Sequence, residues 1–449
     1  MRVIGSLYMD RLVMNDLVEW KNKSNRKPLM LLGVRQCGKT YIAKKFGEEH
    51  FDSVAYFNFE GNEALSSLFD YNLDVYRIIN ELNSVTSGDK IVAGRTLLIF
   101  DEIQSSPNAI TSLKYFCEDM PELHIIAAGS LLGVSLNREE LSFPVGKVER
   151  ITMYPLSFKE FVFANGDGNL IDALDSMDKT REIPELYTEP LKKHLQNYYI
   201  IGGMPEAVDV WINTHSYEEV ENVQSNIIED YENDFAKYAP INEVTKIRQI
   251  WHSIPEQLAK DNNKFVFSHV KKGGRARELE DALEWLIDAG LVYKQKLVEE
   301  PELPLPYMAD DTAFKIFMSD VGLLRYKSNV YYKTILEGDD RYVRFKGAIA
   351  ENYVLTELVK NGMPYYYWRS GNQAEVDFLS EYKGYIIPIE VKSAENTRAK
   401  SFTSFVSKYK SKFGFKVSLK NVGDNKVKDT LVYSLPLYML WKIKEYIVE

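Results

Sequence analysis

The sequence of 449 residues has few of the residues that build disulfide or zinc sites. Two cysteines, Cys37 and Cys117, are too few for a disulfide framework. The six histidines include no HExxH pair and there is no CxxC, so no zinc motif is present. No run of about 18 apolar residues occurs, so no membrane-spanning helix is expected. Asp10 and Arg11 interrupt the apolar stretch that an export signal requires, and we therefore expect a cytoplasmic protein.

Positive charge is also scarce, because the chain carries a net charge of −10. This balance argues against a nucleic-acid partner. Residues 392–428 are the exception, with ten basic residues against two acidic ones, a net charge of +8. Such a segment is either a solvated face or an electrostatic footprint for phosphates, and the sequence leaves both open.

The first third of the chain alternates apolar strands with helical stretches. Strands are predicted over 28–32, 54–60, 96–100 and 123–129. The first is entirely apolar, as expected for a strand that is buried on both faces. Alternation of this kind predicts an α/β fold with a parallel sheet.

After about residue 155 the sequence predicts helices, with breaks at Gly202, Gly203 and Pro205. Residues 245–325 follow the order of a winged helix, namely helix, helix, helix and hairpin; a plain helical packing domain fits equally well. The last of these helices places apolar residues on one face and is stopped by Gly290. The C-terminal part then reads as a helix over 347–362, strands over 364–369, 375–382 and 384–393, further helices, and a strand over 430–435.

The segment GVRQCGKT (33–40) fits the phosphate-loop pattern G-x-x-x-x-G-K-[ST], or Walker A motif, in full. It follows an apolar strand and opens a helix, which is the context that the pattern requires. The loop turns backbone N–H groups toward phosphate oxygens at the positive end of the helix. Lys39 is expected to reach the β- and γ-phosphates of ATP, and Thr40 to bind Mg²⁺. The predicted nucleotide contacts are Gly33, Val34, Arg35, Gln36, Cys37, Gly38, Lys39, Thr40 and Tyr41.

The segment TLLIFDEIQ (96–104) supplies the Walker B half of such a site. Asp101 ends a buried strand, where its carboxylate can hold Mg²⁺, and Glu102 is placed to orient or deprotonate the attacking water. The alternative is that both are surface acids at a strand end. Ser130 ends another strand and is a candidate for contacting the γ-phosphate. Arg138 and Arg150 are both candidates for an arginine finger.

These motifs, together with YPLSFKEF, GGMPEA, FMSDVGLL, GAIAENYV and EVDFL…PIEVKS, occur in the order found in a prokaryotic family. The chain resembles the AAA+-related P-loop ATPases that carry a C-terminal domain of unknown function. The resemblance implies four regions: an ATPase core over 1–165, a helical lid or linker over 166–240, a winged helix over 241–330, and a PD-(D/E)xK nuclease-like domain over 331–449.

The nuclease-like motif falls on Asp377, Glu390 and Lys392. In a strand, alternate side chains share a face, so Glu390 and Lys392 point the same way, and pairing across a hairpin brings Asp377 beside them. Glu351, on the preceding helix, is a fourth candidate. A Mg²⁺-dependent phosphodiesterase would use the three carboxylates as metal ligands and Lys392 for the attacking water. The alternative is that the fold survives without cleavage.

We therefore expect a Mg²⁺-dependent ATPase that couples its nucleotide state to a C-terminal half facing nucleic acid, DNA rather than RNA. The first alternative is a nucleotide-dependent switch for protein partners, with an inactive nuclease-like fold. The second is a nucleic-acid-binding module that hardly turns ATP over. Whether the chain forms an oligomer is left open. Cys37 is hypothesised to react with thiol alkylators and to be protected by ATP–Mg²⁺; the alternative is a buried, inert thiol.

Overall fold

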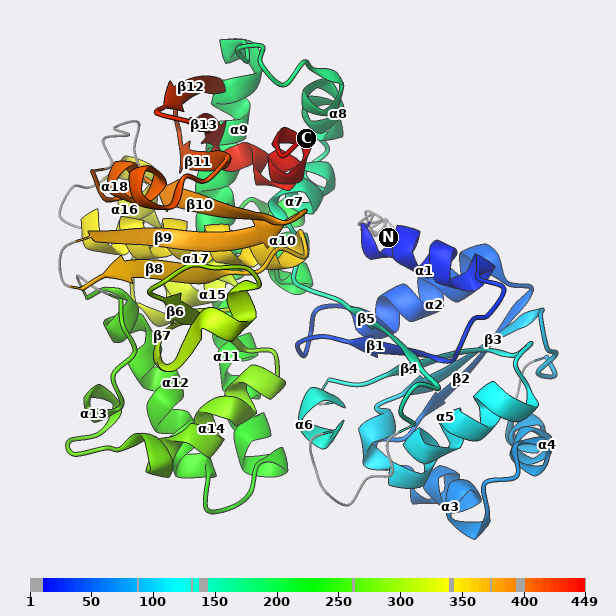
Figure 1. Ribbon diagram of the computed structural model, residues 1–449. Coiled ribbons are helices and arrows are strands. Elements are labelled where there is room, and N and C mark those ends of the chain that lie inside the picture. Colours follow the sequence, from blue (N-terminus) through cyan, green and yellow to red (C-terminus); the bar gives the residue numbers. More distant parts are fainter. Residues whose placement is uncertain are drawn as a thin grey trace. The chain divides into compact units, whose positions relative to one another are not determined.

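The computed structural model describes residues 11–86, 89–130, 132–136, 144–260, 263–338, 343–371, 374–392 and 400–448. These residues form two compact units (Figure 1). The N-terminal unit comprises residues 11–154 and 288–291, and the C-terminal unit comprises 155–287 and 292–448. No described helix combines the length and the apolar character needed to cross a membrane.

The N-terminal unit is built on a five-stranded parallel sheet, as the sequence predicts. Its strands have the order β2-β3-β4-β1-β5. Their bounds are β1 Leu29–Leu32, β2 Ser53–Asn58, β3 Thr96–Asp101, β4 His124–Ala128 and β5 Glu149–Thr152. The first four were predicted, whereas β5 was not. Among the described residues it pairs only with β1, and its own residues are alternately half-buried and exposed, so it lacks the apolar run that marks a central strand.

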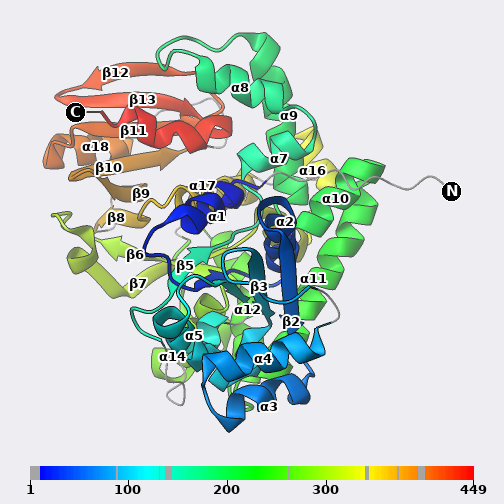
Figure 2. The same ribbon diagram turned by 90° about the vertical axis from the view of Figure 1, so that its right-hand side faces the viewer.

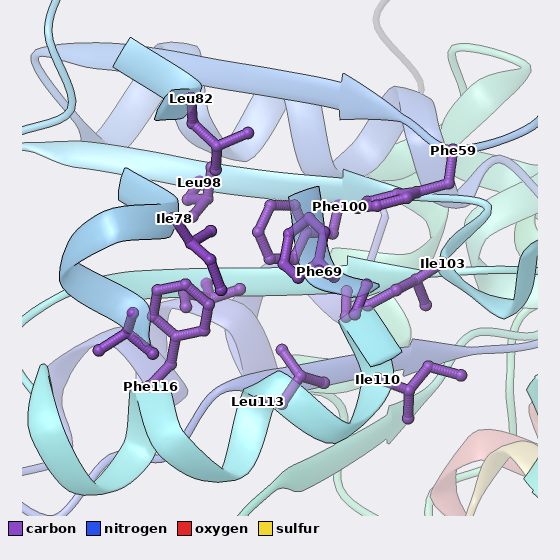
Figure 3. Close-up of a cluster of buried hydrophobic side chains, with 14 of the residues drawn as sticks. Phe59, Phe69, Ile78, Leu82, Leu98, Phe100, Ile103, Ile110, Leu113 and Phe116 are labelled. Carbon is purple, nitrogen blue, oxygen red and sulfur yellow. The ribbon is translucent and has the colours of Figure 1, made fainter. Parts of the chain in front are cut away.

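Helices cover both faces of this sheet (Figures 1 and 2). On one face lie α1 (Val13–Asn22) and α2 (Lys39–His50), where Trp20 packs against Phe46. On the other face lie α3 (Glu63–Tyr71), α4 (Val75–Val85) and α5 (Pro107–Asp119). Figure 3 shows the core on this second face, where phenylalanines from the sheet and the helices meet (Phe59, Phe69, Phe100 and Phe116). Short helical turns, η1 (Ile103–Ser105) and α6 (Leu132–Leu136), follow β3 and β4.

The C-terminal unit begins with helices, and its described residues contain no strand before β6. The helices are α7 (Phe158–Ala164), α8 (Gly168–Ser176), α9 (Glu185–Ile201), α10 (Pro205–Thr214), α11 (Tyr217–Tyr238), α12 (Val244–Leu258), α13 (Phe267–Val270) and α14 (Ala276–Asp288). The predicted apolar face of α14 is buried, including Leu279, Leu283 and Leu286. Gly290 follows this helix with φ of 72°, a left-handed conformation that ends helices.

The motifs YPLSFKEF, GGMPEA and FMSDVGLL meet at one buried point. The Gly203 amide donates to Asp320 Oδ2 at 2.6 Å, and the Leu156 amide donates to the Gly203 carbonyl at 2.7 Å. Asp320 also caps α15 (Val321–Lys327) by accepting from the Leu323 amide at 2.9 Å. Gly202 has φ of 79°, and a Cβ there would lie 2.1 Å from Asp320 Oδ1. Hydrogen bonds among these three motifs therefore stabilise this part of the C-terminal unit.

A second, eight-stranded mixed sheet has the order β12-β13-β11-β10-β9-β8-β6-β7. The strands are β6 Val292–Val298, β7 Ala309–Met318, β8 Tyr366–Ser370, β9 Ala374–Tyr382, β10 Tyr385–Val391, β11 Phe413–Ser418, β12 Gly423–Val427 and β13 Thr430–Pro436. The remaining elements are η2 Leu305–Met308, α15 Val321–Lys327, α16 Tyr332–Glu337, α17 Val343–Lys360, α18 Lys400–Tyr409 and η4 Leu437–Tyr446. The sequence interpretation missed β11 and β12. The hairpin β6–β7, expected as the wing, belongs to this sheet, since β6 pairs in parallel with β8.

The two faces of this sheet pack against different elements. Trp368, Val376 and Leu379 pack against the buried side of α18. The opposite face carries Lys315, which approaches Glu351 of α17. The turn between β9 and β10 lies at Lys383 and Gly384, with φ of 50° and 75°, as a tight hairpin requires.

Candidate functional site

The phosphate loop lies between β1 and the N-terminus of α2. Gly33 has φ of 140°, and a Cβ there would lie 2.1 Å from the Met153 carbonyl oxygen, so only glycine fits. Gly38 has φ of 94° and directly precedes α2. The Lys39 amine is almost buried and donates to the carbonyls of Gly33 and Val34 at 2.8 and 2.9 Å. The lysine is thus held by the loop itself, through bonds that phosphate oxygens can replace.

Other loop residues differ in their access to solvent. Arg35 and Gln36 are half-buried, and the Tyr41 side chain is 47% exposed. Cys37 is completely buried and its thiol faces the Met153 carbonyl at 3.6 Å. Burial of this kind favours the inert-thiol alternative over the alkylation hypothesis, because a reagent cannot reach the sulfur without local opening.

The two groups predicted to hold Mg²⁺ are in direct contact. The Thr40 hydroxyl, at the start of α2, donates to Asp101 Oδ2 at 2.9 Å, at the end of β3. The same carboxylate oxygen accepts from the Tyr56 hydroxyl at 2.7 Å. Burial, and next the hydrogen bond to Asp101, raise the pKa of Tyr56, so it stays a donor. Sequence reasoning missed Tyr56, because nothing in its strand marks it as facing Asp101.

Glu102 is held by two polar neighbours. Its backbone is left-handed, with φ of 50° and ψ of 39°, a costly conformation for a residue other than glycine. Gln104 Nε2 donates to Glu102 Oε2 in a short hydrogen bond, and the Ser130 hydroxyl donates to the same oxygen at 3.3 Å. Ser130, predicted to contact the γ-phosphate, thus also touches the predicted catalytic carboxylate. Gln104 was missed, although its place in DEIQ could have drawn attention to it.

Of the two arginine-finger candidates, Arg138 lies outside the described residues. Arg150 lies in β5, paired with Met30 of β1.

Comparison with known families supports the assignment of this loop. Residues 25–162 match an AAA domain model. The N-terminal unit is therefore an AAA-related P-loop domain. Two further stretches, residues 192–333 and 346–439, match domains of unknown function, DUF8612 and DUF4143. No curated protein matches the chain.

Several solved structures resemble the chain at low identity. A Walker-type ATPase of Pyrococcus abyssi is 14% identical, with 71% of this chain and 95% of that chain covered and a TM-score of 0.45. The ORC1 protein of Aeropyrum pernix in complex with DNA is 12% identical, with 72% and 92% covered and a TM-score of 0.30. AMPPCP-bound DnaA of Aquifex aeolicus is 14% identical, with 62% and 86% covered and a TM-score of 0.29.

Outside the AAA-related domain, a second group of charged residues lies at one end of β9 and β10. Pairing of these strands ends at Phe378 and Ile389, and the Val391 amide then donates to Asp377 Oδ2 at 2.7 Å. Lys392 Nζ donates to Glu390 Oε1 at 2.6 Å. The side chains of Asp377, Glu390 and Lys392 are therefore brought together, as the hairpin argument predicts.

Gln295 of β6 supports this arrangement and was not predicted. The pairing of β8 with β9 is irregular between Tyr366 and Trp368. The buried Gln295 side chain donates to the carbonyls of Tyr366 and Asp377, at 3.0 and 2.8 Å. It thereby satisfies backbone acceptors at the irregularity beside Asp377.

Lys315 of β7 also enters this group and was missed by the sequence interpretation. Its side chain is 1% exposed, and its Nζ lies 2.7 Å from Glu375 Oε1 and 3.8 Å from Glu351 Oε2. Burial alone would lower the pKa of Lys315, but the carboxylates of Glu351 and Glu375 raise it, so the amine is charged. Asn263 Nδ2 donates to Glu351 Oε2 at 2.9 Å.

We call Glu351, Glu375, Asp377, Glu390, Lys315 and Lys392 the acidic cluster. Burial first, and then Asp377, raise the pKa of Glu390 to about 7. Burial likewise raises the pKa of Glu351 to about 7. Within the described part of the chain, no group of three or more His, Cys, Asp or Glu side chains is arranged to hold a metal ion. The expected magnesium ligands Glu351, Asp377 and Glu390 are thus neighbours that do not form a ready ligand set.

Proposed function

We propose that this protein is a Mg²⁺-dependent ATPase whose nucleotide state controls its C-terminal unit. The observation that carries this proposal is the meeting of Thr40, Asp101 and Glu102 beside a complete phosphate loop. The hydroxyl comes from α2, the carboxylate of Asp101 from β3, and the loop from the β1–α2 connection. They converge at the carboxyl ends of the strands of the parallel sheet.

The residues divide the work as follows. The loop N–H groups bind phosphate oxygens, and Lys39 exchanges its two carbonyl partners for the β- and γ-phosphates. Glu102 orients or deprotonates the attacking water, while Gln104 and Ser130 fix the direction of its carboxylate. Because the Glu102 backbone is left-handed, its position is set by the surrounding structure and not by local preference.

The donor set around Thr40 fits magnesium. A hydroxyl and a carboxylate are hard oxygen ligands, and they already touch each other. Thr40 and Asp101 would hold the ion, which when bound supplies positive charge to the phosphate oxygens. Tyr56 would keep the Asp101 carboxylate oriented.

We further propose that the C-terminal unit contains a winged helix followed in sequence by a PD-(D/E)xK nuclease-like domain. We propose that this unit binds DNA. The helices α12, α13 and α14 occur in the order of a winged helix, and the hairpin β6–β7 that follows them is shared with the eight-stranded sheet. Of the basic residues in the segment 392–428, seven described lysines are exposed, as a phosphate footprint requires. They are Lys400, Lys408, Lys410, Lys412, Lys420, Lys426 and Lys428. Arg398 lies outside the described residues.

A second candidate function is a nucleotide-dependent switch that docks protein partners. The net charge of −10 favours it, because an acidic chain repels nucleic acid at long range. Salt dependence separates the candidates. DNA binding through the lysines should weaken steeply between low and moderate salt and should fall when Lys426 and Lys428 are both replaced by Gln. Binding that is absent at low salt would support the docking switch.

The ATPase proposal is tested by Glu102→Gln. We expect ATP binding to be retained and turnover to fall by about 100-fold or more, because the amide cannot act as a base. Gln104→Ala, which removes the support and keeps the carboxylate, should give a smaller loss. Hydrolysis by Glu102→Gln at the wild-type rate would show that Glu102 does not position the water.

A further inference from the structure

The acidic cluster contains more carboxylates than ammonium groups. Four carboxylates lie close together on α17, β9 and β10, faced by two ammonium groups (Glu351, Glu375, Asp377 and Glu390; Lys315 and Lys392). Crowded carboxylates repel one another, and metal-dependent hydrolases offset this repulsion with a divalent cation. The repulsion within this cluster therefore also requires a compensating cation.

Lys315 is anchored where such a cation would be needed. Its backbone is part of β7, paired with Gln295, and its neighbours Phe314 and Ile316 are buried. The side chain cannot swing into solvent, since it is 1% exposed and its ammonium lies 4.9 Å from the centre of the Tyr367 ring. The ammonium therefore remains between Glu375 and Glu351 as a fixed part of the protein.

The remaining carboxylates are partly occupied as well. Asp377 uses one oxygen for the Val391 amide, and Glu390 uses one for Lys392. Glu390 Oε2 has no hydrogen-bond partner in the described structure. The two lysines thus supply positive charge where a metal ion would otherwise supply it, whereas Mg²⁺ requires a nearly regular set of free oxygen ligands.

We propose that the Lys315 ammonium is the resident cation of the acidic cluster and keeps divalent metal out of it. This inference rests on the proposed nuclease-like assignment. It implies that the C-terminal unit binds its target without cutting it. Lys315 comes from the stretch that matches DUF8612, whereas the acids come from the stretch that matches DUF4143. One matched domain thus supplies the ammonium group that compensates the carboxylates of the other.

The test compares Mn²⁺ binding to nucleotide-free, full-length wild type and Lys315→Met by calorimetry. We expect Lys315→Met to bind one Mn²⁺ at least about tenfold more tightly than wild type, and to lose it when Asp377→Asn is added. The matched control is Lys294→Met, which removes a lysine from the neighbouring strand that pairs with Glu284 outside the cluster. This control should behave as wild type.

Two results would overturn the proposal. One is a wild-type protein that binds Mn²⁺, lost on Asp377→Asn, as tightly as Lys315→Met does; the other is a folded Lys315→Met that gains no such binding. If Lys315→Met does not fold, Lys315→Met with Glu375→Gln removes both members of the closest pair and keeps three carboxylates, with the same expectation. ATP turnover, measured on the same proteins, should be unchanged by Lys315→Met. Absence of turnover in wild type would refute the ATPase proposal without affecting the Mn²⁺ comparison.

Discussion

The two charged sites differ in what their buried lysine contacts. Lys39 of the phosphate loop is 7% exposed and donates to backbone carbonyls, which are neutral. Lys315 of the acidic cluster is 1% exposed and pairs with carboxylates, which are charged. Exchanging a neutral carbonyl for a phosphate gains electrostatic energy, whereas leaving a carboxylate costs it. Lys39 can therefore exchange its partners for a ligand, whereas Lys315 is a structural part of the folded unit.

Replacing each lysine by methionine should separate activity from stability. Lys39→Met should lower ATP turnover by about 100-fold or more and leave the melting temperature nearly unchanged. Lys315→Met should leave turnover unchanged and destabilise its unit by up to about 3–5 kcal/mol, because it leaves partly buried carboxylates uncompensated. Turnover and thermal melts of both variants measure the contrast. Equal losses of stability would show that Lys39 is also a structural cation.

The free energies of unfolding of the two units should change in opposite directions as the pH falls. Burial lowers the pKa of His124, in β4, from 6.5 to about 4. The unfolded chain binds this proton first, so the free energy of unfolding of the N-terminal unit should fall as the pH drops from 6.5 to 4. Glu351 and Glu390 have pKa values raised from 4.5 to about 7. Here the folded state binds the protons first, so these groups should stabilise the C-terminal unit as the pH drops from 7 to 4.5.

Hydrogen exchange followed by mass spectrometry reads each unit separately and checks these slopes. His124→Phe should flatten the response of the N-terminal unit, and Glu351→Gln with Glu390→Gln should flatten that of the C-terminal unit. A response that survives the double substitution would mean that other groups set it.

Asp377 should matter through its oxygen rather than its charge. Asp377→Ala removes the acceptor of the Val391 amide and should destabilise the end of β10 by about 1–3 kcal/mol. Asp377→Asn keeps an oxygen acceptor and should cost less. Exchange of the Val391 amide, followed by NMR or peptide mass, measures both. Equal acceleration in the two variants would show that the negative charge is required.

The smallest expected effect concerns the cysteines. Cys117 is partly exposed and Cys37 is buried. Alkylation should therefore label Cys117 first, at a rate that ATP–Mg²⁺ does not change, and Cys117→Ser should react only slowly. Rapid labelling of Cys37 that nucleotide blocks would restore the original hypothesis and show that the loop opens.

The sequence predicted the elements whose signal is local. Four strands of the parallel sheet and the phosphate loop were found because apolar runs and fixed spacings mark them. The edge strand β5 and strand β11 were missed, since β5 lacks an apolar run and FGFKVS (413–418) carries a glycine and a lysine. Lys315 and Gln295 were missed for another reason. Each contacts groups 36 to 82 positions away, Glu351 and Asp377 respectively, and no periodicity reports such a contact.

The eight-stranded sheet has a practical consequence for dividing the chain. The strands β6 and β7 precede residue 334, while β8 to β13 follow it. A fragment that starts at residue 334 would leave β8 as an uncovered edge, with backbone groups free to recruit strands from other molecules. The same cut removes the only lysine that the described structure places against Glu375. Such a fragment should aggregate and take up divalent metal, and its behaviour would misrepresent the intact protein.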